Sequence, residues 1–341
     1  MRRWNRRVAM GLLAALAVWA IAGFFVRPAW AADKIKVTLD WVIYGKHAGF
    51  FAGIDKGIYR KSGLDVTIER GYGSADTIKR VGAKSAVYGF ADFGSLIIGR
   101  SKGVKAKMLS VIHAKSLMAI FTTKGSGIRK PKDLEGRKVG YRAGGAVSTV
   151  LPALLAANQV DASRIQMINM TPTALIPSLV SGKVAASADS FQTEFPTFAA
   201  KAKGVKKEPR SLLFSDFGVD LLSNGLIAHD DTISGQRDRT RRWVESTMRS
   251  FEWAVQNSDE ALRTFTKYAP AIDPKLARAH WDIAVKHLLV PEAKTHGIGY
   301  MLPERVAYAI DTLSRLMKLP KRVSSKEVVD LSLLPKIVIN K

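Results

Sequence analysis

The sequence of 341 residues contains no cysteine and only six histidines. Without cysteine the chain has no disulfide bond, no thiolate nucleophile, no cysteine-ligated metal and no cysteine-linked lipid anchor. The histidines show neither an HExxH motif nor another paired spacing, so no zinc centre is predicted. A glycine-x-serine-x-glycine elbow, a GxGxxG fingerprint and a P-loop are also absent, which argues against a serine hydrolase and a nucleotide site. We therefore expect a protein that is not an enzyme and that uses no cofactor or metal.

The first 31 residues have the pattern of an export signal. Four arginines between positions 2 and 7 precede the apolar stretch 8–26, and Ala29-Trp30-Ala31 supplies the small-x-small pattern that signal peptidase recognises. We expect cleavage after Ala31 and a periplasmic protein. The alternative is a retained anchor, because the apolar stretch approaches the length that spans a bilayer. The chain would then be a membrane-tethered sensory or partner-binding protein.

The remaining residues, 32–341, exceed what one compact core usually holds, so two domains are expected. The net charge of +24 falls to +19 when the five arginines of the leader are subtracted, and the excess is spread along the chain. Such a charge could serve nucleic acid, an anionic membrane surface or an anionic ligand. No basic helix interleaved with aromatic residues is present, so we expect a solvated basic surface and no nucleic-acid partner.

Strands alternate with helices as far as residue 228, and helices follow. The predicted strands are 35–40, 64–68, 88–91, 107–112, 117–122, 138–141, 165–169, 184–188 and 226–228. The predicted helices are 47–56, 74–81, 148–158, 174–181, 237–256, 258–268, 273–287 and 304–317. The last four helices have no strand between them. They cannot form a layered sheet of their own, so we expect them to pack on the first one.

The glycine-rich segment 124–127 predicts a crossover to a second α/β unit. The fold class is therefore α/β, with two lobes joined by two crossover segments and a helical C-terminal portion packed on lobe 1. We place the signal peptide at 1–31, the first part of lobe 1 at 32–123, lobe 2 at 124–224 and the second part of lobe 1 at 225–341.

Several segments resemble a known family in their order along the chain. The segments 39–41 (LDW), 47–52 (HAGFFA), 57–59 (GIY) and 63–66 (GLDV) resemble the opening of solute-binding proteins for thiamine-pyrimidine precursors, alkanesulfonates, taurine and nitrate. Segment 131–141 resembles the start of their second domain, and 182–186 one of their late strands. The resemblance implies a type II periplasmic-binding fold that feeds an ABC importer. A small-molecule ligand, a permease in the inner membrane and a monomeric state are expected with it.

The sequence departs from this family in one place. Residues 42–45 (VIYG) stand where many relatives have a proline-asparagine pair, which leaves the identity of the ligand open. The family also has enzyme relatives, the yeast-type pyrimidine synthases, which use a cysteine-rich iron motif. A chain without cysteine lacks that chemistry.

Ligands of open α/β sheets bind beyond the carboxyl ends of the strands, so the residues that follow each strand are candidates. Asp40 and Trp41 follow the first strand, where an indole offers a stacking face and a carboxylate accepts N–H groups. The alternative is that Trp41 fills the core and Asp40 caps the next turn. His47 opens a helix, where it either meets an anion or caps the turn. Ser95 is a further ligand candidate, whereas Asp92 is predicted to form a turn.

The loop 142–149 is the strongest local signal for a site. Gly144 and Gly145 allow the backbone to approach a ligand, and the following helix offers free N–H groups and a positive dipole end. Arg142, Ser148 and Thr149 would add donors for a carboxylate, sulfonate or phosphate. The alternative is a flexible turn with Ser148 as the N-cap.

Asp189, Phe191 and Glu194 follow the strand predicted at 184–188. The acids could accept amino groups of a heterocycle and Phe191 could stack on it. Alternatively, Asp189 caps the next helix and Glu194 is exposed in its first turn. We expect a ligand held between the two lobes, either a small planar heterocycle of the pyrimidine type or a small anion such as an alkanesulfonate, taurine, nitrate or a carboxylate.

Overall fold

The computed structural model describes residues 32–339, and the predicted signal peptide at 1–31 lies outside them. From Lys34 onward the described chain forms one compact unit built on two five-stranded sheets. Within this part of the chain, none of the helices combines the length and apolar character that crossing a membrane requires.

The first sheet has the strand order β2-β1-β3-β10-β4. These strands are β1 (Asp33–Thr38), β2 (Leu64–Glu69), β3 (Tyr88–Asp92), β4 (Ala106–Val111) and β10 (Asn224–His229). β1 and β3 are parallel, whereas β10 runs antiparallel to β3 and β4. The register pairs Asn224, the first residue of β10, with Asp92, the last residue of β3. This pairing brings two distant segments to the same edge of the sheet.

The second sheet has the order β7-β6-β8-β5-β9. Its strands are β5 (Met118–Thr123), β6 (Lys138–Tyr141), β7 (Gln166–Asn169), β8 (Ala186–Ser190) and β9 (Pro209–Leu213). β6 is parallel to β7 and β8, and β5 is antiparallel to β8 and β9. We call the first sheet with its helices lobe 1 and the second sheet with its helices lobe 2.

The position of β5 corrects one expectation. From its sequence we expect this strand in lobe 1, but it lies inside the sheet of lobe 2 between β8 and β9. A buried apolar strand has the same sequence pattern in either sheet, so the pattern could not assign it. The glycines at 124–127 form a turn after the strand, where the crossover was expected. The remaining lobe limits stay a prediction.

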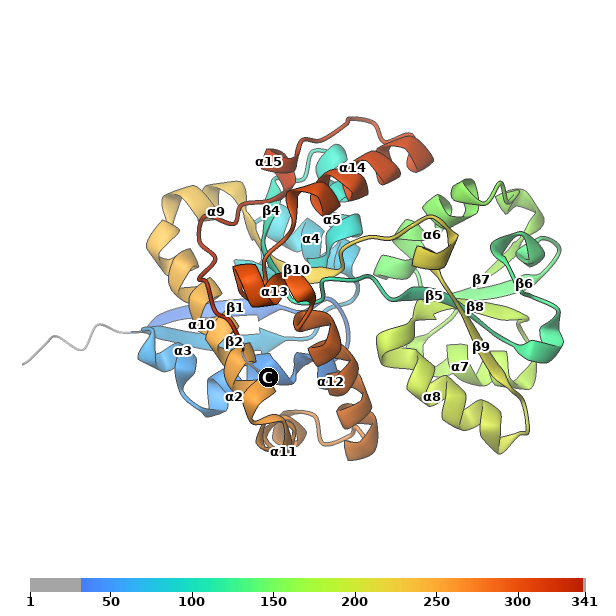
Figure 1. Cartoon of the computed structure of the whole chain (residues 1–341), viewed down its shortest axis with the longest axis horizontal. Helices are drawn as coiled ribbons and strands as arrows, with labels where there is room; N and C mark the ends of the chain where they lie inside the picture. The colour runs from blue at the N-terminus through green and yellow to red at the C-terminus, as the bar shows by residue number, and fades with distance from the viewer. Residues whose placement is uncertain (1–31, 340–341) are drawn as a thin grey trace, which may run out of the picture. The chain divides into compact units, whose positions relative to one another are not determined.

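Helices lie beside both sheets (Figure 1). In the first part of the chain they are η2 (Gly45–His47), α2 (Ala48–Asp55), α3 (Ile58–Lys61), α4 (Ser74–Gly82) and α5 (Phe93–Ser101). Lobe 2 contains η3 (Lys124–Ser126), η4 (Pro131–Leu134), α6 (Ala146–Ala157), η5 (Ala162–Arg164), α7 (Pro172–Ser181), α8 (Phe191–Gly204) and η6 (Phe214–Phe217).

The C-terminal part is helical, as predicted. It consists of α9 (Asp230–Gly235), α10 (Arg237–Gln256), α11 (Ser258–Tyr268), α12 (Pro274–Leu288), α13 (Pro291–His296), α14 (Pro303–Met317) and α15 (Ser325–Val328). α10 and α11 pack on α2 of lobe 1, which confirms the expected packing. α12 also contacts α8 of lobe 2, and α14 contacts α6, so the C-terminal helices touch both lobes.

The core of lobe 1 explains why α10 packs where it does. The apolar residues of α10 recur at helical spacing and face inward, and Trp243 of this helix stacks on Tyr88 with ring centroids 4.0 Å apart. Phe251 of the same helix meets Phe50 of α2 edge to face at 5.1 Å. Burying one large apolar side chain stabilises a fold by about 1.5–3 kcal/mol. These aromatic contacts therefore fix the C-terminal helices on the sheet that carries Asp40 and Asp92.

Candidate functional site

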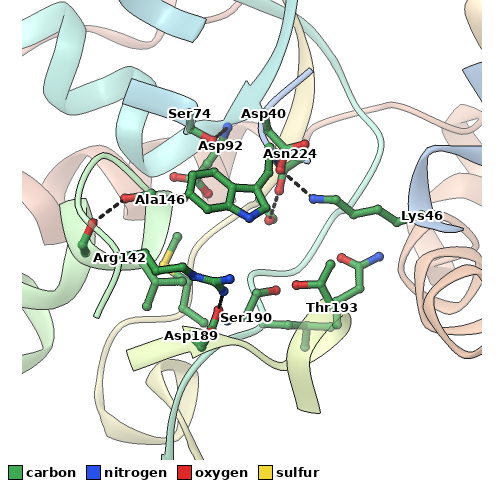
Figure 2. A pocket seen from close by; sticks show the side chains of 18 of the residues that line it. Asp40, Lys46, Ser74, Asp92, Arg142, Ala146, Asp189, Ser190, Thr193 and Asn224 are labelled. Carbon is green, nitrogen blue, oxygen red and sulfur yellow. Dashed lines mark hydrogen bonds and ion pairs between the residues drawn. The ribbon is translucent and has the colours of Figure 1, made fainter. Parts of the chain in front are cut away.

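A cavity lined by residues of both lobes lies between them, and part of it is open to solvent. Its lining comes from the ends of the parallel strands: Trp41 follows β1, Asp92 ends β3, Arg142 follows β6 and Asp189 lies at the end of β8. Figure 2 shows Asp92 of lobe 1 and Arg142 and Asp189 of lobe 2 around the cavity. The strand-end rule therefore locates the cavity correctly.

The predicted site residues fall into two groups. Those that line the cavity are Asp40, Trp41, Arg142, Gly145, Ser148 and Asp189. Those outside its lining are His47, Ser95, Gly144, Thr149, Phe191 and Glu194. Ligand contact by the members of either group stays a prediction, and the geometry of each is described below.

Trp41 presents its indole to the cavity, so it does not fill the core of lobe 1. The guanidinium carbon of Arg142, from the other lobe, lies 5.3 Å from the centre of the indole ring. The indole Nε1 is buried and has no hydrogen-bond partner among the described residues. The site thus offers an aromatic face and one unused N–H donor.

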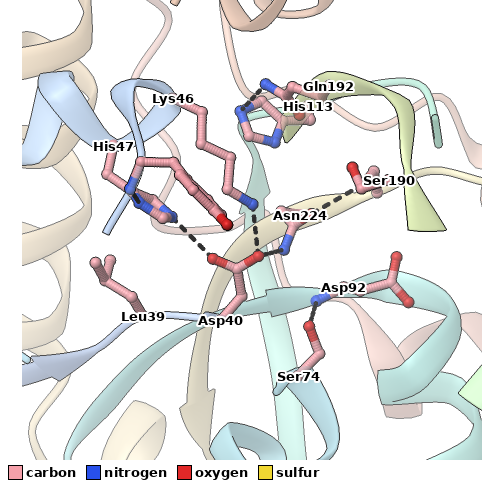
Figure 3. A network of polar contacts seen from close by, with 12 residues as sticks. Leu39, Asp40, Lys46, His47, Ser74, Asp92, His113, Ser190, Gln192 and Asn224 are labelled. Carbon is pink, nitrogen blue, oxygen red and sulfur yellow. Dashed lines mark hydrogen bonds and ion pairs between the residues drawn. The ribbon is translucent and has the colours of Figure 1, made fainter. Parts of the chain in front are cut away.

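Asp40 is the centre of a buried polar cluster (Figure 3). Its Oδ2 accepts from Lys46 Nζ at 2.6 Å and from Asn224 Nδ2 at 3.0 Å, and its Oδ1 lies 2.8 Å from His47 Nε2. The backbone N–H of Tyr44 donates to His47 Nδ1 at 3.1 Å, so the proton of the neutral ring is on Nε2 and is donated to Asp40. His47 therefore orients Asp40 and does not face the cavity.

The cluster also fixes the charges of its members. Burial raises the pKa of Asp40, but the charges and hydrogen bonds of Lys46 and His47 outweigh it and hold this pKa well below its usual range. Burial lowers the pKa of His47 more than Asp40 raises it, so the imidazole stays neutral near pH 7. Asp40 is an anion whose two oxygens are both occupied by protein donors.

The short helix η2 positions this cluster. Gly45, in the segment that departs from the family pattern, packs so closely on α12 that a Cβ atom there would collide with the carbonyl oxygen of Ala277. The next two residues, Lys46 and His47, are then directed at Asp40. The segment 42–45, where the sequence differs from the family pattern, thus includes a glycine that the close packing against α12 requires.

Asp92 is the N-cap of α5, where the sequence predicts a turn. Its Oδ1 accepts from the backbone N–H of Ser95 at 2.7 Å and from the Ser95 hydroxyl at 2.9 Å. Ser95 is therefore engaged with Asp92 and lies outside the cavity lining. Asp92 Oδ2 is buried without a hydrogen-bond partner among residues 32–339, and Asp92 itself lines the cavity. Burial raises the pKa of Asp92 to about 6.

Arg142 holds two carboxylates of lobe 2. It contacts Asp189 Oδ1 through one nitrogen and Glu194 Oε1 at 3.2 Å through another. Burial raises the pKa of Asp189 to about 7. The positive charge of Arg142 opposes this rise, and the negative charge of Glu194 adds to it. Glu194 is buried, which excludes the alternative of an exposed residue in the first turn of α8. Asp189 Oδ2 has no partner within the described chain.

The loop 142–149 differs from the simplest expectation. Gly145, and not Ser148, is the N-cap of α6, while the hydroxyls of Ser148 and Thr149 both donate to the Gly145 carbonyl at 2.9 Å. Gly144 has a φ of 76°, and its carbonyl lies so close to Gly73 of lobe 1 that a Cβ there would collide with it. The two lobes thus meet at this edge of the cavity.

Phe191 does not line the cavity. It stacks on Phe195 with ring centroids 4.4 Å apart and packs on the apolar cluster of lobe 2. Phe191 is the first residue of α8, and its side chain packs toward the interior of its own lobe.

Two further contacts join the lobes. The Tyr44 hydroxyl donates to Glu194 Oε1 at 2.6 Å, and His280 Nε2 of α12 donates to the Thr193 carbonyl at 2.8 Å. Burial lowers the pKa of His280 to about 4, so this donor is a neutral imidazole near pH 7.

Sequence reasoning missed several polar residues of the lining, among them Tyr44, Lys46, Asp92 and Asn224. Asn224 could have been found. The first residue of an antiparallel strand lies beside the last residue of the strand it pairs with, and Asn224 therefore lies beside Asp92. Tyr44 and Lys46 are in a turn whose path depends on packing against α12, which no local pattern reveals.

The charge of the lining is opposite to that of the chain. Three carboxylates line the cavity, Asp40, Asp92 and Asp189, against two cations, Lys46 and Arg142. Each cation is paired: Lys46 with Asp40, and Arg142 with both Asp189 and Glu194. A chain with a net charge of +24 therefore carries an acidic cavity.

Comparison with known proteins identifies relatives over most of the chain. A Haemophilus influenzae protein named for thiamine biosynthesis is 22% identical over 245 residues, covering 71% of this chain and 76% of that protein. The formylaminopyrimidine-binding protein of Halalkalibacterium halodurans is 22% identical over 237 residues, 68% of this chain and 69% of its own. The riboflavin-binding protein RibY of Chloroflexus aurantiacus is 21% identical over 244 residues, 70% and 67% of the two chains.

A shorter match concerns an enzyme. The 4-amino-5-hydroxymethyl-2-methylpyrimidine phosphate synthase of Uromyces fabae is 26% identical over 112 residues, which is 33% of each chain. This match leaves two thirds of either protein uncovered.

Solved structures share the fold. A Bordetella bronchiseptica protein superposes with a TM-score of 0.70 at 17% identity, covering 89% of this chain and 96% of its own. The alkanesulfonate-binding protein SsuA of Xanthomonas axonopodis has a TM-score of 0.61 at 12% identity, with 88% and 99% of the chains covered. These likenesses confirm the predicted periplasmic-binding fold. The family model described as NMT1/THI5 like matches residues 45–261, more than half of the sequence. The chain therefore belongs to the NMT1/THI5-like family.

Proposed function

We propose that this protein is the substrate-binding component of an ABC importer, exported to the periplasm by a cleaved signal peptide. It captures a small planar heterocycle, similar to the pyrimidine precursors of thiamine, between its two lobes and delivers it to a permease in the inner membrane. Two of the relatives described above, each matching about 70% of the chain, carry the names of binding proteins, and both named ligands are heterocycles. The enzyme match covers only a third of the chain.

One observation carries the choice of ligand: an indole face and an acidic lining meet in the same cavity. Trp41 offers a flat surface for a ring, while Asp92 and Asp189 each present a buried carboxylate oxygen without a partner in the described chain. Buried polar atoms are normally hydrogen-bonded, so these oxygens favour a ligand with N–H groups. A micromolar dissociation constant corresponds to about 8 kcal/mol, which a stacked ring and a few charge-assisted hydrogen bonds can supply.

A small anion is the second candidate, and one feature favours it. The first residues of α6, Ala146–Ser148, line the cavity, and the N-terminus of a helix attracts negative charge. The structural likeness to the alkanesulfonate-binding protein gives the fold but not the ligand. Because Lys46 and Arg142 are already paired with carboxylates, an anion would meet no free cation in the lining.

Closure of the lobes supplies the capture mechanism. A ligand that contacts both lobes stabilises the closed arrangement over an open one by its differential affinity. The contacts Tyr44–Glu194 and His280–Thr193 join the lobes directly and belong to the closed arrangement. They close the cavity around the ligand and would form again in each cycle of capture.

A thermal-shift screen of purified residues 32–341 tests the proposal. The panel contains 4-amino-5-hydroxymethyl-2-methylpyrimidine, a formylaminopyrimidine, riboflavin, taurine, an alkanesulfonate and nitrate. A ligand at a hundred times its dissociation constant stabilises the protein by about 2.7 kcal/mol, which a melting curve resolves. Stabilisation by pyrimidines alone supports the proposal. Stabilisation by the anions alone would overturn it in favour of the second candidate.

A further inference from the structure

Three carboxylates line the cavity, but they differ in what their oxygens already bind. Asp40 accepts hydrogen bonds on both oxygens, from His47 on one and from Lys46 and Asn224 on the other. It has no buried oxygen without a partner. Asp40 is therefore a positioning residue, which holds the turn at 45–47 and the start of β10 in place.

Asp92 is built differently. Its Oδ1 caps α5 through the backbone N–H and the hydroxyl of Ser95, and Oδ2 has no partner in the described chain. The residue is completely buried, and it lines the cavity. A helix cap requires one oxygen, so the second oxygen is available for another purpose.

In lobe 2, Asp189 likewise has one oxygen that is bonded within the protein and one that is not. Its Oδ1 accepts from the backbone N–H of Ser190 at 2.8 Å and contacts Arg142, while Oδ2 lacks a partner in the described chain. Asp189 is only 2% exposed and also lines the cavity. Leaving a carboxylate oxygen desolvated without a donor is unfavourable in both lobes, and one bound molecule could relieve both.

We propose that Asp92 and Asp189 each accept a hydrogen bond from the ligand through Oδ2, one from each lobe, so that the ligand carries at least two N–H donors and no negative charge. This inference rests on the proposed function, since it requires a small molecule in this cavity. Trp41 Nε1 supplies one donor for a ring nitrogen or carbonyl of the same ligand. Amino-substituted heterocycles satisfy this pattern, whereas sulfonates, nitrate and carboxylates do not.

The pattern assigns a role to Asp92 beyond the turn. Because the two acceptors stand on different lobes, a ligand bonded to both connects the lobes and favours closure. An anion would instead place its charge beside two carboxylates, and like charges at short range repel strongly where water is excluded.

The substitution Asp92→Asn tests this role directly. Asparagine is as good an N-cap as aspartate, so its carbonyl oxygen can keep the bonds to Ser95 while an NH₂ group replaces the free oxygen. A donor would then face the donors of the ligand. The matched control is Asp161→Asn, because Asp161 also accepts from the backbone and hydroxyl of a serine, Ser163, but lies on the exposed surface of lobe 2.

The probe is 4-amino-5-hydroxymethyl-2-methylpyrimidine, compared by calorimetry with the same molecule lacking its 4-amino group. Melting curves verify that each variant is folded. We expect the probe to bind at least tenfold more weakly to Asp92→Asn and Asp189→Asn, and with unchanged affinity to Asp161→Asn. Loss of the amino group should weaken binding to the wild type by a similar factor. It should have less effect on Asp92→Asn, where that contact is already lost.

The outcomes separate the two claims. If the wild type binds the probe and Asp92→Asn binds it equally well, Asp92 makes no ligand contact, and this inference fails while the proposed function stands. The same conclusion follows if the amino group contributes as much in the variant as in the wild type. If the wild type binds none of the heterocycles but binds taurine or nitrate, both claims fail.

Discussion

Replacing Trp41 examines the stacking surface by itself. The indole is the aromatic side chain of the lining with a free polar edge, and Arg142 lies over its ring at 5.3 Å. Stacking of a heterocycle on an aromatic side chain contributes about 1–3 kcal/mol, and a hydrogen bond from Nε1 contributes about 1 kcal/mol more. We therefore expect Trp41→Ala to weaken the binding of a pyrimidine by about 2–4 kcal/mol, or roughly 30- to 1,000-fold. Calorimetric titration measures this loss.

Two further variants divide the effect of Trp41. Trp41→Phe keeps an aromatic face but removes Nε1, so a loss of about 1 kcal/mol, near fivefold, is expected. Trp253→Ala is the matched control, because Lys56 lies over the Trp253 ring at 5.1 Å and that tryptophan is not part of the cavity lining. Wild-type affinity in Trp41→Ala would refute the role of the indole as the ligand platform.

Four other predictions concern the cavity, the stability of the fold and the leader. The pKa is raised to about 7 for Asp189 and to about 6 for Asp92, so both carboxylates are ionised above pH 7 in the free protein. Pyrimidine affinity should therefore be greatest above pH 7 and fall as the pH drops through about 7 and then about 6. When the affinity of Asp92→Asn is measured against pH, the decrease near pH 6 should be absent. Tyr44→Phe removes the 2.6 Å bond to Glu194 and should weaken ligand binding by about 1 kcal/mol while leaving the wild-type preference among ligands, as a competition assay would show. Ser324→Ala removes the capping box at α15 and should lower the melting temperature by about 2 °C without altering affinity. Mass measurement of the exported protein should give a chain that begins at Ala32, whereas an intact N-terminus would favour the membrane-tethered alternative.

The sequence was informative wherever a local pattern determines the structure. The periodicity of 237–256 and 258–268 predicts α10 and α11 to the residue, and the spacing of Ser324 and Glu327 predicts the capping box that the structure contains. Strand ends likewise located the cavity, because Asp40 and Trp41 follow β1 in one sheet, Arg142 follows β6 in the other, and all three residues line the cavity.

The sequence was uninformative wherever tertiary pairing decides. The apolar strand β5 carries no mark of the sheet it joins, and only its antiparallel pairing with β8 and β9 places it in lobe 2. β9 was missed because Pro209 and Arg210 interrupt the apolar pattern of this edge strand. Asp92 differs from Asp40 in having one carboxylate oxygen without a partner in the described chain. This difference depends on the contacts of Asp92 with Ser95 and of Asp40 with Asn224, which no sequence spacing predicts.

Ligand-dependent closure of the two lobes is the claim on which the account depends, and the absence of cysteine makes it directly measurable. Cysteines introduced at the exposed positions Lys61 in lobe 1 and Lys201 in lobe 2 would carry spin labels without competing sites. Adding 4-amino-5-hydroxymethyl-2-methylpyrimidine should shift the distribution of distances between the labels to a single shorter distance, while taurine and nitrate should leave it unchanged. A distribution that the pyrimidine leaves unaltered, or that only an anion shortens, would contradict the account.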